Sequence, residues 1–195
     1  MRYEPDRKHA TRARVIETAA RVLRRDGIAA AGVASLMAEA GLTNGAFYAH
    51  FASKEALVAE AVVSALGETR TAMAQKIAQA APGLALDAVI AHYLDPRHVA
   101  HPEHGCAVAA LGPELSRRPE STRAAVDAAV DALVVTIAEA LEPGHPDRIA
   151  MARAVFASMV GTIQLARTVR PALVASVLAE GASTVHRIAR LPSKH

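Results

Sequence analysis

Residues 41–57, with the sequence GLTNGAFYAHFASKEAL, constrain the fold of this chain more than any other segment. Gly41 suits a tight turn because glycine adopts left-handed backbone angles at little cost. Thr43 and Ser53 are each placed to cap a following helix by accepting from its free backbone N–H groups. The helix between these two caps is only about two turns long, and so short a helix is stable only when neighbours hold it. The sequence therefore predicts a small helical domain that presents the polar face of a short helix.

Composition favours helices along the whole chain. Hydrophobic residues make up 52% of the 195 residues, mostly Ala, Val and Leu, whereas aromatic residues make up only 3%. No apolar run reaches the roughly 18 residues that span a bilayer, and the charged N-terminus lacks the apolar stretch of a secretory signal. The single cysteine, Cys106, excludes an internal disulfide and fits a reducing compartment. We therefore expect an all-α cytoplasmic protein without a membrane segment.

The apolar spacing and the turn residues predict about nine helices. Expected helices span residues 7–25, 33–40, a short stretch from 44, 53–80, 86–94, a broken stretch from 106, 119–141, 147–169 and 171–190. Residues 95–105 and 142–146 are rich in turn-forming residues and are expected to be loops.

The spacing of the second and third helices is typical of a helix-turn-helix motif, because only about three residues separate them. In such a motif the later helix reads DNA, with its N-terminal residues nearest the bases. Charge agrees with this interpretation, since residues 1–56 contain nine Lys/Arg and six Asp/Glu, whereas the rest contains thirteen of each. A positive excess confined to one segment indicates a polyanionic partner, although an imbalance of three charges also arises by chance.

Residues 12–57 resemble the N-terminal module of the TetR family of bacterial transcriptional repressors. The resemblance lies in an Arg-led first helix that ends at Gly27, the run AEAGLTNGAFYAHF, the SKEAL that follows, and the spacing of Tyr48, Phe51 and Lys54. Beyond this module the chain resembles the family only in its length and its helical plan. One departure is Gly32, which stands where family members often have Ser or Thr as a helix cap.

The resemblance implies two domains and a mechanism. Residues 1–56 would form a three-helix DNA-binding domain with the helix-turn-helix, and residues 57–195 a larger helical domain for effector binding and dimerisation. The implied function is a ligand-responsive repressor that binds a palindromic DNA operator as a dimer and is released by a small-molecule effector. In such proteins the ligand prefers the conformation that fits the operator poorly.

Seven residues form the expected DNA-contact surface: Thr43, Asn44, Gly45, Ala46, Tyr48, His50 and Lys54. Thr43 and Tyr48 offer hydroxyl groups, and Lys54 offers an ammonium that can reach a phosphate beside a helix N-terminus. Asn44 can pair with an adenine edge or contact a phosphate. The two small residues after Asn44 allow the backbone to lie close to the groove, whereas both phenylalanines of this segment are expected to pack the core.

The helices expected at 147–169 and 171–190 indicate a homodimer. The first carries small residues at spacings that allow close helix approach: Ala150, Ala154, Ala157, Ser158 and Gly161. The second is apolar, and two such helices from each subunit can form a four-helix bundle, as in the resembled family. The same pattern also fits packing within one chain. A palindromic operator calls for a two-fold protein, which favours the dimer.

Candidate residues of the effector cavity are chosen from the apolar helices of the larger domain. They are Tyr93, Cys106, Leu111, Phe156, Met159 and Gln164, and packing of the core explains most of them equally well. Charged residues are scarce in these helices, so we expect an uncharged or weakly polar ligand.

Cys106 supports an alternative, a repressor that senses oxidants or electrophiles. It is expected near a helix N-terminus, where the helix dipole lowers the pKa of a thiol and favours the reactive thiolate. Some TetR-family repressors sense such compounds through a cysteine in a comparable place, but free cysteine is also commonly a small buried hydrophobe. His98, His101 and His104 are further metal-ligand types near Cys106. Their spacing matches no zinc signature, so no metal and no cofactor is expected.

Two other classes of protein compete with this interpretation, a helical enzyme and a helical interaction protein that does not bind DNA. The sequence contains no H-E-x-x-H, no G-x-S-x-G, no phosphate-binding loop and no inward Glu-x-x-His pair. We therefore expect no enzymatic activity, and specific binding to duplex DNA separates the repressor from both alternatives.

Overall fold

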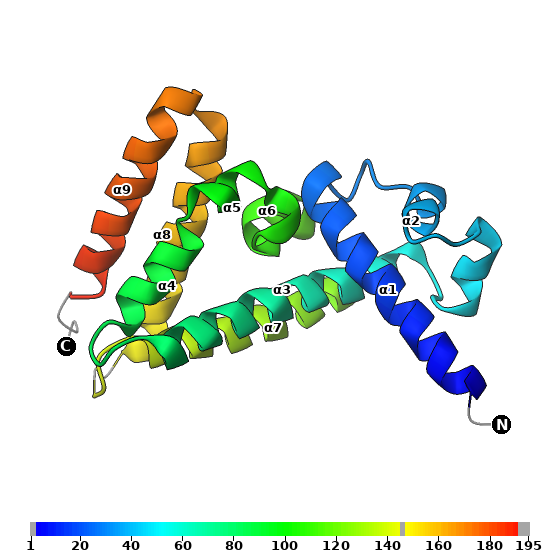
Figure 1. Ribbon diagram of the computed structural model, residues 1–195, viewed down its shortest axis with the longest axis horizontal. Coiled ribbons are helices and arrows are strands. Elements are labelled where there is room, and N and C mark those ends of the chain that lie inside the picture. Colours follow the sequence, from blue (N-terminus) through cyan, green and yellow to red (C-terminus); the bar gives the residue numbers. More distant parts are fainter. Residues whose placement is uncertain (1–2, 145–146, 191–195) are drawn as a thin grey trace.

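The computed structural model describes residues 3–144 and 147–190, with side chains from residue 7 onward, and every regular element in these ranges is a helix. The elements are α1 (Tyr3–Asp26), α2 (Val33–Glu39), η1 (Asn44–Ala49), α3 (Lys54–Gln79), α4 (Ala85–Tyr93), α5 (Pro96–Ala100), η2 (Pro102–His104), α6 (Ala107–Leu115), α7 (Glu120–Glu139), α8 (Arg148–Thr168) and α9 (Pro171–Ile188). Figure 1 shows α1 and α2 at one end of an elongated molecule and α8 and α9 at the other. α3 and α7 run side by side between the two ends.

α1 forms because apolar residues recur along one of its faces. Val15, Ala19, Val22 and Leu23 are all buried, which confirms the predicted first helix. It ends at Asp26 because Gly27 has a φ of +87°, a left-handed conformation that stops helices.

The turn between α2 and η1 also depends on a left-handed glycine. Gly41 has a φ of +72°, and the amide of Leu42 donates to the carbonyl of Met37 at 2.8 Å. Thr43 then precedes η1, which is a 3-10 helix rather than an α-helix. The predicted cap by Thr43 is wrong, because its side chain makes no capping hydrogen bond.

α3 begins where the sequence predicts. The Ser53 hydroxyl accepts a hydrogen bond from the amide of Ala56 at 3.1 Å, which confirms the predicted cap. Leu57, Ala61 and Ala65 are fully buried along the same helix, which packs against both α1 and α7. The expected domain division after residue 56 falls in the first turn of α3, so both parts share this helix.

The prediction of a loop at residues 95–105 is wrong, since this segment contains the short helices α5 and η2. The Asp95 carboxylate caps α5 by accepting from the amide of Arg97 at 2.7 Å, and Pro96 suits the first position of the helix. A Pro- and His-rich composition led to the loop assignment, whereas Asp followed by Pro is also a helix start. In the second expected loop, residues 145–146 lie outside the described residues.

α6 accommodates Pro113 in its last turn. A proline has no N–H group, so the carbonyl of Ala109, four residues earlier, loses its helical partner. Arg167 of α8 replaces that partner, since its Nη1 donates to the Ala109 carbonyl at 3.2 Å. The helix therefore continues through Gly112-Pro113 and ends at Leu115.

α8 and α9 form an antiparallel pair at the far end from α1. Within the described residues, α8 is the one helix long and apolar enough to cross a bilayer by length and composition. The sequence prediction, based on unbroken apolar runs, did not find this helix. However, Phe156, Met159 and Ile163 of α8 are buried inside the protein, and a core helix passes the same test.

The contact between α8 and α9 predicts a cost for adding one methyl group. A Cβ at Gly181 would lie 2.3 Å from Cγ2 of Thr162, whose hydroxyl is fixed by donating to the Ser158 carbonyl at 2.8 Å. Gly181→Ala should therefore lower the free energy of unfolding by about 1–3 kcal/mol in denaturant titrations. Gly67→Ala in α3 is the matched control, because no atom lies within 4 Å of its added Cβ. This control should be stabilised by about 0.5–1 kcal/mol, and equal effects at both sites would contradict the close packing.

Candidate nucleic-acid interface and effector cavity

η1 is held by two buried aromatic rings. Phe47 is 1% exposed and Phe51 is 3% exposed, and their rings stack with centroids 5.7 Å apart. Tyr48, next to Phe47, is 77% exposed. Burial of both phenylalanines is as predicted, and it fixes a short helix that could not be stable alone. Because η1 is fixed in this way, the exposed side chain of Tyr48 is available to a binding partner.

The seven predicted contact residues divide into two groups. Thr43, Asn44, Gly45 and Tyr48 are exposed, whereas Ala46, His50 and Lys54 are half-buried. Nζ of Lys54 donates to the carbonyl of Ile28 at 3.0 Å, so its ammonium joins the α1–α2 loop to α3. His50 has its Nδ1 buried without a hydrogen-bond partner among the described residues, and its carbonyl accepts from Nε of Arg12 at 3.4 Å.

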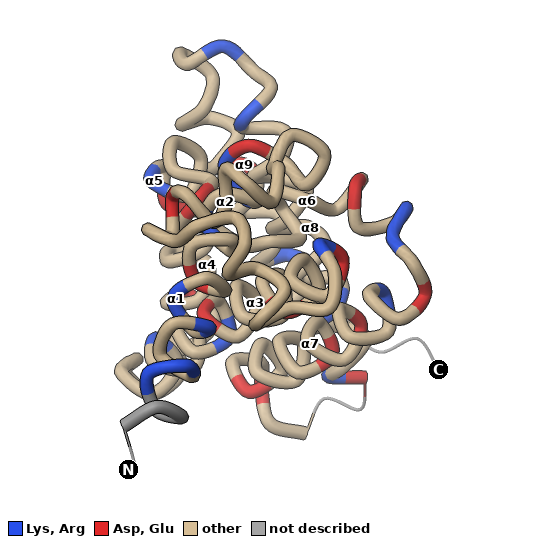
Figure 2. The backbone as a smooth tube through the Cα atoms, turned by 90° about the vertical axis from the view of Figure 1, so that its right-hand side faces the viewer, with Lys and Arg blue, Asp and Glu red and all other residues tan. Residues whose placement is uncertain are grey.

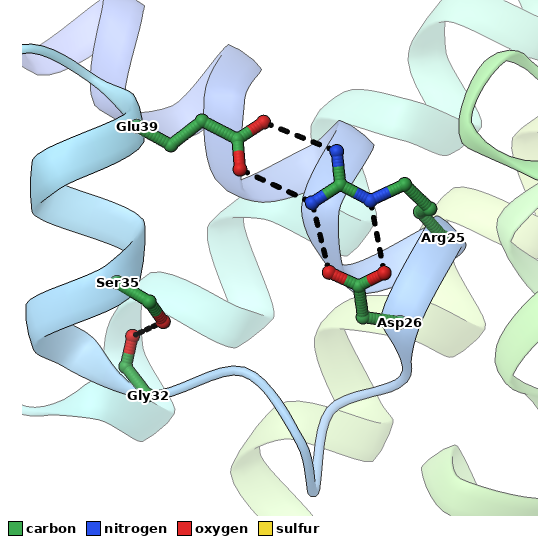
Figure 3. A network of polar contacts seen from close by, with 5 residues as sticks. All are labelled: Arg25, Asp26, Gly32, Ser35 and Glu39. Carbon is green, nitrogen blue, oxygen red and sulfur yellow. Dashed lines mark hydrogen bonds and ion pairs between the residues drawn. The ribbon is translucent and has the colours of Figure 1, made fainter.

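Much of the positive charge in residues 1–56 is used inside the protein. Arg25 donates to the carboxylates of both Asp26 and Glu39, which joins the end of α1 to the end of α2 (Figure 3). Donating these hydrogen bonds to Asp26 and Glu39 raises the pKa of Arg25, and the contact with Arg25 lowers the pKa of Asp26. Arg12 similarly pairs with Glu60 at 2.5 Å.

The free positive charge lies in the N-terminal half of α1. Arg7, Lys8 and Arg14 are exposed and form no ion pair within the described part of the chain. Figure 2 shows Lys and Arg gathered along this part of the helix. The sequence analysis counted these charges but did not name the residues as DNA contacts. The density of basic residues in the run DRKHATRAR could have indicated them.

A buried arginine connects α1 to the larger domain. The side chain of Arg24 is 2% exposed, and its guanidinium donates in three directions. The acceptors are the carbonyl of Ala20 at 2.9 Å, the carbonyl of Gly105 at 2.8 Å and the carboxylate of Glu68 at 3.0 Å. Arg24 lies four residues after the buried Ala20, on the same face of α1. This spacing could have predicted a buried Arg24, but the sequence analysis did not single it out.

Two glutamates complete the connection. Glu114 of α6 accepts from the amides of Ile28 and Ala29 at 3.2 and 2.9 Å, immediately after α1. Glu55 of α3 accepts from Arg118 and from the hydroxyl of Thr122, and the contact with Arg118 lowers the pKa of Glu55. The helix-turn-helix region is therefore fixed to α6 and α7 through charged hydrogen bonds, which are stronger than neutral ones.

A cavity of about 550 Å³ lies beside this connection, between α3, α4 and the segment from α5 to the start of α6. It is lined by Glu68, Thr69, Ala72, Lys76, His92, Tyr93, Asp95, Arg97, His98, His101, His104, Gly105 and Cys106. Two of these residues, Glu68 and Gly105, are also the acceptors of Arg24. The cavity therefore shares part of its wall with the link to α1.

Only Tyr93 and Cys106 of the predicted cavity residues line this cavity. Leu111, Phe156 and Met159 are buried core residues, and Gln164 is half-buried beside Gly112. The lining also differs from the apolar helices on which the expectation of an uncharged or weakly polar ligand was based, because most of its residues are histidines or charged. The reason is that the lining comes from α3, α4 and the 95–106 segment, whereas the prediction drew mostly on the most apolar helices.

His98 is held as a neutral imidazole between two elements. The amide of Cys106 donates to Nε2 of His98 at 3.0 Å, so Nδ1 carries the proton and donates to the Tyr93 carbonyl at 2.7 Å. Burial lowers the pKa of His98 to about 4. Both nitrogens are engaged, which leaves His98 no lone pair for a metal.

Cys106 precedes α6, as predicted, but its thiol does not have the predicted character. The residue is 1% exposed, and burial raises the pKa of the thiol, although the Tyr93 hydroxyl and the amides of Ala109 and Val108 act in the opposite direction. Desolvation therefore outweighs the helix N-terminus. Little thiolate forms at neutral pH, which removes the physical argument for a reactive Cys106.

Comparisons with known proteins agree with these features. A family profile described as "Bacterial regulatory proteins, tetR family" matches residues 15–61. The uncharacterized HTH-type transcriptional regulator YerO of Bacillus subtilis (strain 168) is 38% identical over 60 residues. That match covers 31% of this chain and 21% of YerO, so the chain matches about a fifth of the length of this curated relative.

Solved structures match almost the whole chain. A TetR-family transcriptional regulator from Cytophaga hutchinsonii has a TM-score of 0.77 at 21% identity, covering 97% of this chain and 98% of that one. A TetR transcriptional regulator from Chloroflexus aurantiacus J-10-FL has a TM-score of 0.74 at 26% identity, covering 96% and 98%. Residues 15–61 therefore match the TetR family profile, and the whole described chain has the fold of TetR-family regulators.

The TetR family profile covers the part of the chain that carries η1. Its match runs from within α1, through α2 and η1, to the first turns of α3. The helix-turn-helix predicted from the sequence is therefore that of a TetR-family transcriptional regulator. The cavity lies outside the matched segment, so the family assignment says nothing about its ligand.

The depressed pKa of His98 predicts a pH-dependent stability. Since its folded-state pKa of about 4 lies below the ordinary 6.5, the unfolded chain takes up the proton first as the pH falls. The free energy of unfolding should therefore decrease from pH 6.5 towards pH 4, by at most about 3 kcal/mol from this residue. In His98→Gln this component should be absent, so the slope of unfolding free energy against pH between 6.5 and 5 becomes shallower. His104→Gln, an exposed histidine on the same segment, is the control, and an unchanged slope in His98→Gln would contradict the assignment.

Proposed function

We propose that this chain is a dimeric transcriptional repressor of the cytoplasm that binds a palindromic operator and is released by a small-molecule effector. In this proposal residues 1–56 form the DNA-binding domain and residues 57–195 the effector-binding and dimerisation domain. The observation that carries it is the exposure of Tyr48 on η1, which buried Phe47 and Phe51 hold in place. Proteins with this helix-turn-helix are transcriptional regulators, and we propose no catalytic role.

The DNA contacts are proposed for residues at and before η1. Thr43, Asn44 and Tyr48 are exposed and carry groups that can hydrogen-bond to bases or phosphates. Thr43 is well suited because its hydroxyl is not used as a cap. The exposed cations Arg7 and Lys8 would contact phosphates, since phosphate contacts supply most of the affinity for DNA.

Other predicted contact residues receive a supporting role in this proposal. Lys54 would reach a phosphate only by giving up its hydrogen bond to Ile28. His50 is half-buried, and its carbonyl is bound by Arg12, so it helps to position η1 against α1. Gly45 and Ala46 lie between the exposed residues and keep the backbone accessible, as the sequence suggested.

Dimerisation is proposed through α8 and α9. Small residues of α8 form an exposed stripe, namely Ala150, Ala154, Ala157 and Gly161. Large apolar side chains are exposed on the same two helices, with Leu165 at 53% and Leu173 at 42%. Apolar surface of this kind on a helix pair favours burial against a second copy, which would place two η1 helices on one DNA duplex.

Release from DNA is proposed to begin at the cavity. A ligand there would contact the wall formed by Glu68 and Gly105, both of which bind Arg24 of α1. A ligand that prefers a different position of this wall would shift the orientation of α1, and with it the spacing of the two η1 helices. The thermodynamic requirement is only that the ligand binds the DNA-incompetent orientation more tightly.

Binding to the intergenic DNA that flanks the gene, measured across a salt series, tests the DNA-binding part of this proposal. We expect a specific complex whose affinity falls steeply with salt concentration, because several phosphates are neutralised per subunit. Tyr48→Ala and Asn44→Ala should each weaken the complex by about tenfold or more, and Asn44→Ala should also change the preference among sequences. No preference over random duplex DNA would refute the repressor assignment.

Lys8→Ala separates phosphate contacts from base contacts in the same experiment. It should weaken binding to all sequences alike and reduce the slope of log affinity against log salt by about two for a dimer. The matched control is Arg70→Ala, an exposed cation of α3 outside the DNA-binding end, which should leave the slope unchanged. Equal effects of the two variants would remove α1 from the proposed interface.

A further inference from the structure

We infer that the cavity between α3, α4 and the 95–106 segment binds a small organic acid, with Lys76 holding its carboxylate and Tyr93 lying against its apolar part. The inference rests on the proposed function for its regulatory meaning, but the binding itself is independent of DNA. A volume of about 550 Å³ is within the usual range for small-molecule sites.

Both carboxylates in the wall are already neutralised by arginines. Asp95 accepts from the amide of Arg97 at 2.7 Å and from its guanidinium at 3.0 and 2.8 Å, and this contact lowers the pKa of Asp95 to about 2. Glu68 is bound to the buried Arg24. Neither acid is therefore free to bind a cationic ligand.

Lys76, in contrast, has no ion pair within the described residues. His92 lies near Lys76, and its pKa is lowered by burial and by the positive charges of Lys76 and Arg97, against the opposing charge of Asp95. Lys76 therefore lies in the cavity lining as a cation without an ion pair in the described part of the chain, whereas Arg97 is paired with Asp95. An anionic group is the ligand feature that an unpaired ammonium in the lining stabilises.

A second cation lies beside the cavity lining. Arg167 is half-buried, and its guanidinium donates only to the carbonyls of His98 and Ala109, at 2.7 and 3.2 Å. No carboxylate pairs with it in the described part of the chain. Its charge lies beside His98, which lines the cavity, and Glu103 acts on it electrostatically without forming an ion pair.

The cavity lining also has an aromatic and weakly polar part, formed by Tyr93, Thr69 and Ala72. Tyr93 is 2% exposed, and its buried hydroxyl lies beside the Cys106 thiol. A charged end and an aromatic end together fit an organic acid better than an inorganic anion.

Calorimetric titration of the full-length protein, without DNA, tests the inference with three probes: benzoate, phenylacetate and hexanoate. At least one should bind saturably at millimolar concentration or below, and its neutral amide should bind at least tenfold more weakly. Lys76→Met should weaken binding of that acid by about tenfold or more, because a charge-assisted contact is lost. Arg70→Met, which removes a cation of the same helix outside the cavity lining, should bind like the wild type.

Absence of saturable binding by all three acids, equal affinity for acid and amide, or wild-type affinity of Lys76→Met would each overturn the inference. A parallel DNA-binding assay separates it from the proposed function. An acid that binds through Lys76 but leaves the DNA complex intact would support the inference and contradict regulation from this cavity. Failure of the protein to bind DNA at all would contradict the proposed function and leave the calorimetric result standing.

Discussion

The buried guanidinium of Arg24 is the interaction on which the arrangement of the two ends of this protein depends. Burying a cation is costly unless its donors are satisfied, and Arg24 meets this condition with two carbonyls and one carboxylate. Those acceptors belong to three different parts of the chain: α1, α3 and the residue just before Cys106. Moving any one of them would leave a buried charge partly unpaired. The position of α1 and the shape of the cavity wall are therefore not independent.

The other contacts between the two ends make the connection stiff. Glu114 binds the amides that follow α1, Glu55 binds Arg118 ahead of α7, and Lys54 binds the carbonyl of Ile28. α3 itself is continuous from the helix-turn-helix into the larger domain (Figure 1). In the function proposed above, a ligand would act on this framework by displacing the wall at Glu68 and Gly105, and no flexible linker is needed to transmit the change.

Sequence reasoning succeeded where the determinants are local. Helix ends at Gly27 and Gly41 and the cap at Ser53 follow from backbone angles and one side chain, and all three are present. Predictions from the sequence were wrong where the contacts of a residue come from segments far away in the chain. Thr43 does not cap η1, Lys54 is bound by a loop 26 residues earlier, and the pKa of Cys106 is raised by burial that no local pattern reports. The cavity lining was mostly missed for the same reason, since α3 and the 95–106 segment meet only in the folded chain.

Amide hydrogen exchange in the 98–106 segment, measured with and without the operator duplex, tests the coupling through Arg24 most directly. Because coupling between two sites is reciprocal, DNA that fixes the orientation of α1 should slow exchange in this segment of the wild-type protein. The effect should be lost in Arg24→Gln and kept in Arg25→Gln, whose ion pairs among the described residues are with Asp26 and Glu39 at the surface. Equal protection by DNA in the wild type and in Arg24→Gln would contradict the account.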